Sequence, residues 1–179
     1  MVRQLGYGLF NAMPYSLVDL NRMSQAEFIQ ALGPTFENTP AIAAKAWQQR
    51  PFHSVKELQQ QMVAIVQAMS PQEKLALIQA HPDLGSRVAM AEASVAEQSG
   101  VGLDQLSAAE YEQFQQLNQQ YRQTFGFPFI LAVAGHTKES ILQNFAQRVS
   151  NAPNVEMARA LDEIEKIAHL RLQSWVQES

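Results

Sequence analysis

The chain has 179 residues, a length typical of one domain, and its 46% hydrophobic residues are enough to bury one sizeable core. The formal net charge of −4, from 13 Lys and Arg against 17 Asp and Glu, provides no basic surface for a phosphate backbone, so nucleic acid is not an expected partner. The absence of cysteine excludes disulfides, thiolate nucleophiles and cysteine-bound metals, and it agrees with a cytoplasmic location.

The N-terminal sequence "MVRQLGYGLFNAMPYS" has neither a sustained apolar region nor a clear cleavage site. No apolar stretch in the chain approaches the roughly 20 residues that span a bilayer, so we expect no membrane association. We interpret residues 1–20 as a loose leader outside the core and residues 21–179 as a single helical domain.

Helical periodicity dominates the rest of the chain, and most segments carry their own start signals. Ser24, Ser70 and Ser107 each precede a glutamate by three residues, which is the spacing of a capping box. The expected helices lie within residues 24–33, 39–51, 54–71, 70–81, 107–125, 137–151 and 154–176. The sequence therefore predicts an all-α, single-domain bundle of about seven or eight helices.

Two segments depart from this pattern. Residues 125–135, "FGFPFILAVAG", are aromatic and β-branched enough for a strand, but no second convincing strand exists to pair with them. We predict an extended, buried connection whose backbone groups meet side chains, water or a ligand. Residues 85–102 are rich in alanine and glycine, and we expect them to be the least anchored part of the fold.

His81 stands at the end of an expected helix and directly before Pro82. Unpaired carbonyls at a helix end favour the imidazolium form by roughly 0.3–1 kcal/mol, which suits a histidine that donates a proton. The alternative is that His81 only caps the helix, with Pro82 enforcing the stop. Asp83 either orients the imidazole or begins the turn that follows.

The segment "SVAEQ", residues 94–98, also has two interpretations. Ser94 and Glu97 have capping-box spacing, so the segment could be a plain helix start. However, "EQSGVG" ends the segment almost at once, and a cap with little helix behind it indicates another task. Glu97 and Gln98 together offer a carboxylate and an amide, which suit a heterocycle or ureido group with alternating N–H and C=O groups.

Five short motifs in this order resemble the 2-oxo-4-hydroxy-4-carboxy-5-ureidoimidazoline (OHCU) decarboxylase family. The resemblance extends from about Ser24 to Val176, and the combination is far more specific than any single motif. One departure is "AVAGHTKES", which stands where other members have basic or amide residues around Gly135 and His136. The motifs are "RPF" at 50–52, "HPDLG" at 81–85, "SxxEQ" at 94–98, "FGFPFI" at 125–130 and "EIEKIAHLRL" at 163–172.

The resemblance implies an all-helical carboxy-lyase without cofactor or metal that converts OHCU to (S)-allantoin and CO₂, the last step of urate degradation. It also implies that His81 donates a proton, and it allows a homodimer. We expect Glu97 to be catalytic as well, because its carboxylate can engage the hydroxyl or ureido group of the substrate. The implied substrate-binding residues are Pro82, Ser94, Val95, Ala96, Glu97, Gln98, Phe129, Ile130, Leu131, Ala132 and Val133.

The chemistry of decarboxylation supports this interpretation without the family. Loss of CO₂ leaves an electron pair that an adjacent C=N or C=O of the imidazoline can delocalise, so the protein has only to orient the carboxylate and move protons. Arg171 could meet the substrate carboxylate or form a helix-surface ion pair with Asp162 or Glu163. Trp47 and Trp175 fall on apolar helix faces and are expected in the core.

Two other functions fit parts of the sequence. One is metal-assisted hydrolysis with the four histidines, but no two of them have the spacing of a helical metal site. The other is a helical interaction module that uses the aromatic connection as a peptide groove. A decarboxylase requires a compact polar pocket with His81 in it, whereas the module requires a long apolar groove.

Overall fold

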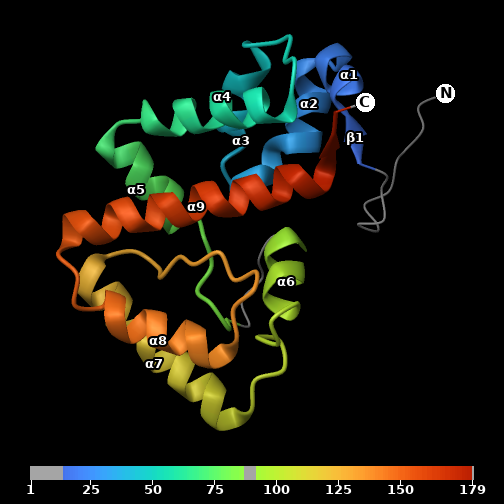
Figure 1. Ribbon diagram of the computed structural model, residues 1–179. Coiled ribbons are helices and arrows are strands. Elements are labelled where there is room, and N and C mark those ends of the chain that lie inside the picture. The colour runs from blue at the N-terminus through green and yellow to red at the C-terminus, as the bar shows by residue number, and fades with distance from the viewer. Residues whose placement is uncertain (1–13, 87–91, 179) are drawn as a thin grey trace.

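The computed structural model describes residues 14–86 and 92–178. Within these ranges the chain forms nine α-helices, one 3₁₀ turn and one pair of two-residue strands (Figure 1). The α-helices are α1 Leu17–Arg22, α2 Gln25–Leu32, α3 Pro40–Trp47, α4 Val55–Gln67, α5 Pro71–Gln79, α6 Glu92–Ser99, α7 Ala108–Phe125, α8 Lys138–Arg148 and α9 Pro153–Trp175, and η1 is Gly33–Thr35. The prediction of an all-α fold is confirmed, and the helices α1 and α6 lie outside the ranges in which helices were expected.

The predicted leader extends too far into the chain. Ser16 caps α1 by accepting a hydrogen bond from the Asp19 backbone N–H, and Leu17 and Leu20 are buried in the core. Just before α1, the strand β1 (Tyr15–Ser16) pairs in parallel with β2 (Val176–Gln177) after α9. Residues 14–20 therefore belong to the domain, whereas residues 1–13 lie outside the described ranges. Helix α1 was missed because six residues are too few to show a helical period.

The predicted start signals are confirmed at three helices. Ser24, Ser70 and Ser107 each form a complete capping box at the N-terminus of α2, α5 and α7. These boxes satisfy N–H groups that have no partner within the helix, and each cap contributes about 1 kcal/mol. Local sequence therefore decides where these helices begin.

Helix α9 crosses the middle of the molecule and separates two groups of helices (Figure 1). Helices α1–α5 lie on one side, where α4 and α5 pack against α9, and helices α6–α8 lie on the other. Buried residues occur along most of α9, in keeping with neighbours on both sides. None of the helices in the described ranges is both long and apolar enough to cross a membrane.

The connection between α7 and α8 runs alongside α9 without regular secondary structure (Figure 1). Phe127 and Phe129 are buried, and both rings pack against Tyr121 of α7. Side chains bind some of its backbone groups: Gln79 donates to the Gly126 carbonyl, for example. The predicted extended, buried connection is confirmed. For the segment 85–102, residues 87–91 lie outside the described ranges, and the rest includes α6.

Candidate active site

A cavity lies where the end of α5, helix α6, the aromatic connection and α9 meet. The cavity is small, because the lining side chains leave about 30 Å³ accessible to a water-sized molecule. Three ionisable side chains, those of His81, Glu97 and Arg171, lie among mostly apolar neighbours. The cavity therefore offers a few polar contacts within an apolar lining. The lining residues are His81, Pro82, Leu84, Ser94, Glu97, Gln98, Phe129, Ile130, Leu131, Val133, Ile167 and Arg171.

His81 follows Ala80, the C-cap of α5, and is only 6% exposed. Its Nδ1 lies 2.9 Å from the Leu77 carbonyl oxygen. A carbonyl only accepts hydrogen bonds, so Nδ1 carries the proton and Nε2, on the other side of the neutral ring, has the lone pair. Burial lowers the pKa of His81 from 6.5 to about 4, although the bond to Leu77 and the charge of Glu37 oppose this shift. The expected imidazolium is therefore wrong at neutral pH, because burial outweighs the helix end.

The turn after His81 is held by residues of two other helices. The backbone N–H of Gly85 donates to Gln98 Oε1 at 2.9 Å, and Asn118 of α7 donates to the Leu84 carbonyl at 2.8 Å. Asp83 pairs with Arg122 of α7 at 2.8 Å. Asp83 therefore does not orient the imidazole, and its carbonyl instead begins the turn by accepting from the Ser86 N–H. We expected the Gln98 amide on the ligand, and its oxygen instead accepts the hydrogen bond from Gly85 in this turn.

Arg171 of α9 is the centre of a buried polar network. Its Nε and Nη2 donate to the two oxygens of Glu97 at 2.6 and 2.8 Å, in the two-point geometry typical of guanidinium and carboxylate. Nη2 also donates to Ser94 Oγ at 3.1 Å, and Nη1 donates to the Pro34 carbonyl at 2.8 Å. Of the two alternatives for Arg171, the surface ion pair with Asp162 or Glu163 is wrong, since the Arg171 side chain is only 3% exposed and pairs with Glu97 and Glu37.

Glu37 is a member of this network that the sequence analysis missed. It follows η1 and has a fully buried side chain. Its Oε2 accepts from Ser94 Oγ at 2.6 Å and lies 3.4 Å from Arg171 Nη1. Arg171 thus contacts two acidic side chains, Glu37 and Glu97, beside His81. The sequence marks Glu37 only as an acidic residue directly after an aromatic one, Phe36, which the structure buries.

The structure brings together most of the predicted site residues, but not all. Ser94 and Glu97 lie in α6 and both contact Arg171, so the interpretation as a capping box is wrong. Val95 is 50% exposed and does not line the cavity. Ala96 and Ala132 also lie outside its lining and border a neighbouring apolar hollow. The polar residues of "SVAEQ" thus face inward while the residues between them face away, as helical spacing requires.

The other three histidines lie away from His81. His136 and His169 line a separate cavity, and His53 is exposed before α4. Among the described residues, no three His, Asp or Glu side chains are close enough to one another to hold a metal ion. The cavity around His81 is compact and carries charged groups, so it also does not match the long apolar groove of an interaction module.

Comparison with known proteins agrees with this geometry. The family model described as OHCU decarboxylase matches residues 21–173. The chain belongs to the OHCU decarboxylase family. It is therefore a decarboxylase, a carboxy-lyase, as the sequence motifs predicted. The match covers every described residue of the cavity and includes Glu37.

Individual relatives support the assignment. The chain is 43% identical over 157 residues to an OHCU decarboxylase of Haloferax volcanii, covering 88% of this chain and 94% of that protein. A uric acid degradation bifunctional protein of a Bacillus species is 43% identical over 157 residues, which is 31% of its length. Among solved structures, an (S)-allantoin synthase superposes with a TM-score of 0.73 at 32% identity, over 90% of this chain and 54% of that one.

Proposed function

We propose that this enzyme decarboxylates OHCU to (S)-allantoin and CO₂ in the degradation of urate, with His81 as the group that moves the proton. The observation that carries the proposal is the state of His81: its ring is buried on the cavity wall, and Leu77 fixes which nitrogen holds the proton. The names of the relatives supply the substrate and the product.

The neutral ring of His81 requires a proton to be taken before one is given. Nε2 accepts the proton of the substrate hydroxyl as the bond to the carboxylate breaks and CO₂ leaves. The electron pair of that bond moves into the ring, forms a C=C bond and shifts the C=N electrons to the ring nitrogen, which takes a proton from water. The oxygen then becomes a carbonyl, and the imidazolium of His81 returns its proton to the ureido-bearing carbon. Proton delivery from one side sets the S configuration.

Glu97 and Arg171 act together in this scheme. The Arg171 guanidinium holds the Glu97 carboxylate at two points, while the Glu97 side chain keeps 33% of its surface exposed. The Glu97 carboxylate is thus held in place and still accessible to a ligand, and we assign it to the ureido N–H of the substrate, since the hydroxyl proton goes to His81. Because the nitrogens of Arg171 already donate to protein oxygens, Arg171 acts on the substrate through Glu97.

The backbone of residues 129–133 supplies the remaining contacts. The ring and ureido group of OHCU alternate N–H and C=O groups, which peptide groups complement. Pro82 and Phe129 line the cavity and would provide apolar surface around the ligand. Assembly as a homodimer and a cytoplasmic location stay predictions.

The direct test generates the unstable substrate from urate in situ and follows optically active allantoin by circular dichroism. We expect the wild-type protein to accelerate formation of the S enantiomer over the spontaneous reaction. His81→Asn is expected to lose most of this acceleration. The proposal fails if the wild-type protein gives no acceleration, and the role of His81 fails if the variant turns over normally.

A further inference from the structure

Two buried charged side chains hold the backbone of the aromatic connection beside the cavity. Arg148 of α8 donates from Nη1 to the Ile130 carbonyl oxygen at 2.7 Å. Glu163 of α9 accepts from the Ala132 N–H at 2.9 Å. These two contacts lie on either side of Leu131, which lines the cavity. Within the described residues, the N–H and C=O of Leu131 themselves form no hydrogen bond.

Because of peptide geometry, these two contacts also fix the direction of the Leu131 backbone groups. The Ile130 carbonyl and the Leu131 N–H belong to one planar, trans peptide group and point in opposite directions. Binding of the carbonyl by Arg148 therefore aims the Leu131 N–H away from Arg148. In the next peptide group, Glu163 binds the Ala132 N–H, which aims the Leu131 carbonyl away from Glu163.

Arg148 is itself held firmly. Its Nε donates to Glu156 Oε1 at 2.8 Å, and its guanidinium lies 4.4 Å from the centre of the Phe129 ring. Glu156 is fully buried and also accepts hydrogen bonds from Tyr121 and Asn151. This anchor is wholly internal, and it links α7, α8 and α9 to one carbonyl of the connection.

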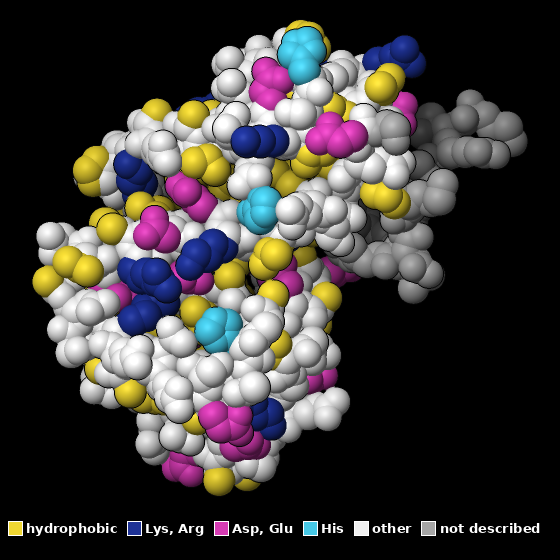
Figure 2. Space-filling model, in the orientation of Figure 1, with side chains coloured by type: hydrophobic (Ala, Val, Ile, Leu, Met, Phe, Trp, Pro, Cys, Tyr) yellow, Lys and Arg dark blue, Asp and Glu magenta, His cyan; other side chains and the backbone are white. Residues whose placement is uncertain are grey.

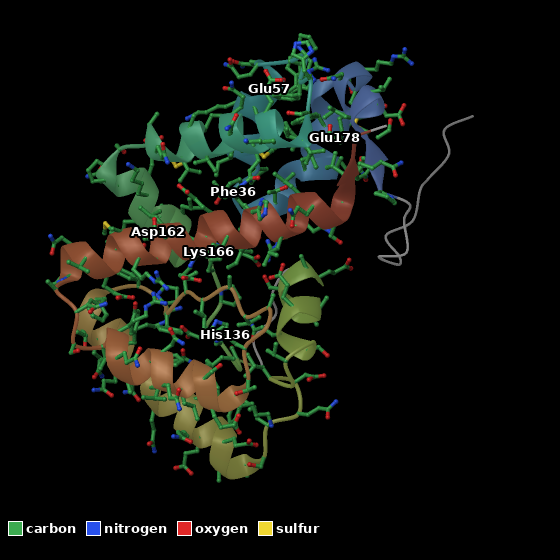
Figure 3. The ribbon with its side chains drawn as sticks, viewed as in Figure 1. Phe36, Glu57, His136, Asp162, Lys166 and Glu178 are labelled. Atoms are coloured by element: carbon green, nitrogen blue, oxygen red, sulfur yellow. The ribbon has the colours of Figure 1, made fainter. Side chains whose placement is uncertain are left out.

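Glu163 is held in place by two cationic side chains at the protein surface. Its side chain is 2% exposed, and its Oε1 contacts Lys166 at 2.8 Å and Arg159 at 3.0 Å, which are 52% and 43% exposed. Figure 2 shows Lys and Arg side chains gathered on this face, and Figure 3 places Lys166 on α9 above His136. Burial opposes ionisation, but the hydrogen bonds from Lys166 and Ala132 and the two cations hold the pKa of Glu163 below its usual value. The bond to the Ala132 N–H is thus charge-assisted at neutral pH.

We propose that Arg148 and Glu163 form a two-point clamp on the aromatic connection, which presents the N–H and C=O of Leu131 to the ligand. Both are positioning residues, and neither touches the substrate. The inference rests on the proposed function, because it assigns the two Leu131 groups to the alternating C=O and N–H groups of OHCU and allantoin. Without the clamp, the connection keeps its apolar contacts but loses the orientation of its peptide groups.

Substitutions at Glu163 separate the clamp from its surface partners. Glu163→Ala removes the acceptor for the Ala132 N–H, whereas Glu163→Gln keeps an amide oxygen there without the charge. Lys166→Met is the matched control, because it removes an ion-pair partner of Glu163 and leaves the bond to Ala132 in place. For each protein we would measure the Kd of (S)-allantoin by calorimetry, KM and kcat with substrate made in situ, and the Tm.

We expect Glu163→Ala to weaken allantoin binding and raise KM about tenfold, the equivalent of one hydrogen bond, while kcat falls less than about threefold. Glu163→Gln is expected to restore both values to within about threefold of wild type, and Lys166→Met to match wild type. The clamp is refuted if Glu163→Ala binds allantoin normally, if Glu163→Gln is as defective as Glu163→Ala, or if Lys166→Met shows the same defect.

Amide exchange in the wild-type protein tests the clamp without a substitution, and so covers the case in which Glu163→Ala does not fold. The Ala132 amide is expected to be protected without ligand, and the Leu131 amide to become protected only when (S)-allantoin is added. An unprotected Ala132 amide, or a Leu131 amide indifferent to bound allantoin, would overturn the inference. A wild-type protein that neither binds allantoin nor accelerates the reaction would instead refute the proposed function, while Ala132 protection still reports on the clamp.

Discussion

Acid should destabilise this protein through His81, because the folded state holds this ring neutral. Burial lowers the pKa of His81 from 6.5 to about 4. Between these two values the unfolded chain binds a proton that the folded chain does not, so stability falls as the pH is lowered through this window. Linkage gives a loss from His81 alone of about 2 kcal/mol at pH 5 and about 3 kcal/mol at pH 4, relative to pH 7.

The measurement compares wild type with His81→Asn by urea unfolding at pH 7, 6, 5 and 4. Asparagine keeps an N–H for the Leu77 carbonyl but has no group that titrates in this range. Carboxylates titrate in both proteins, so the difference between the two free energies of unfolding isolates His81. We expect that difference to shift by about 3 kcal/mol toward the variant between pH 7 and pH 4. A difference that stays constant, or an NMR titration of the His81 ring near pH 6.5, would refute the reasoning.

Three further predictions concern the cavity and its supports. Glu97→Gln should lower kcat more than it weakens binding of (S)-allantoin, because the carboxylate is needed mainly to hold the ureido group while the hydroxyl proton passes to His81; an unchanged kcat with a large rise in KM would contradict this. The amides of α6 should exchange more slowly when allantoin is bound while those of α7 change little, since α6 carries Glu97 but few large apolar side chains; full protection of α6 without ligand would mean that the site is preformed. Arg148→Met should reduce the free energy of unfolding by about 3–5 kcal/mol, because it leaves Glu156 buried without its cation, and a loss below about 1 kcal/mol in urea unfolding would argue against that.

Signals within a few residues of one another were enough for much of the fold. The capping boxes at Ser24, Ser70 and Ser107 could be predicted because a cap and its partner are three residues apart and need no other part of the chain. The buried connection could be predicted because an aromatic, β-branched segment without a partner strand has few other places to lie. Helix α1 could not, since six residues are too few to show a helical period and Leu17 and Leu20 become buried only in the packed core.

The features of the site also divide into those that the sequence predicts and those that depend on tertiary structure. The sequence by itself determined the family, the all-α class and the short motifs that place His81, Glu97 and the aromatic connection at the cavity, because each motif is continuous in the chain. Only the tertiary structure decided the charge state of His81 and the hydrogen-bond partners of the other groups. Glu37 and Arg171 stand 134 residues apart in sequence, and the charge state of His81 follows from burial by several elements at once. Burial and long-range pairing depend on the whole packed chain, and no local pattern encodes them.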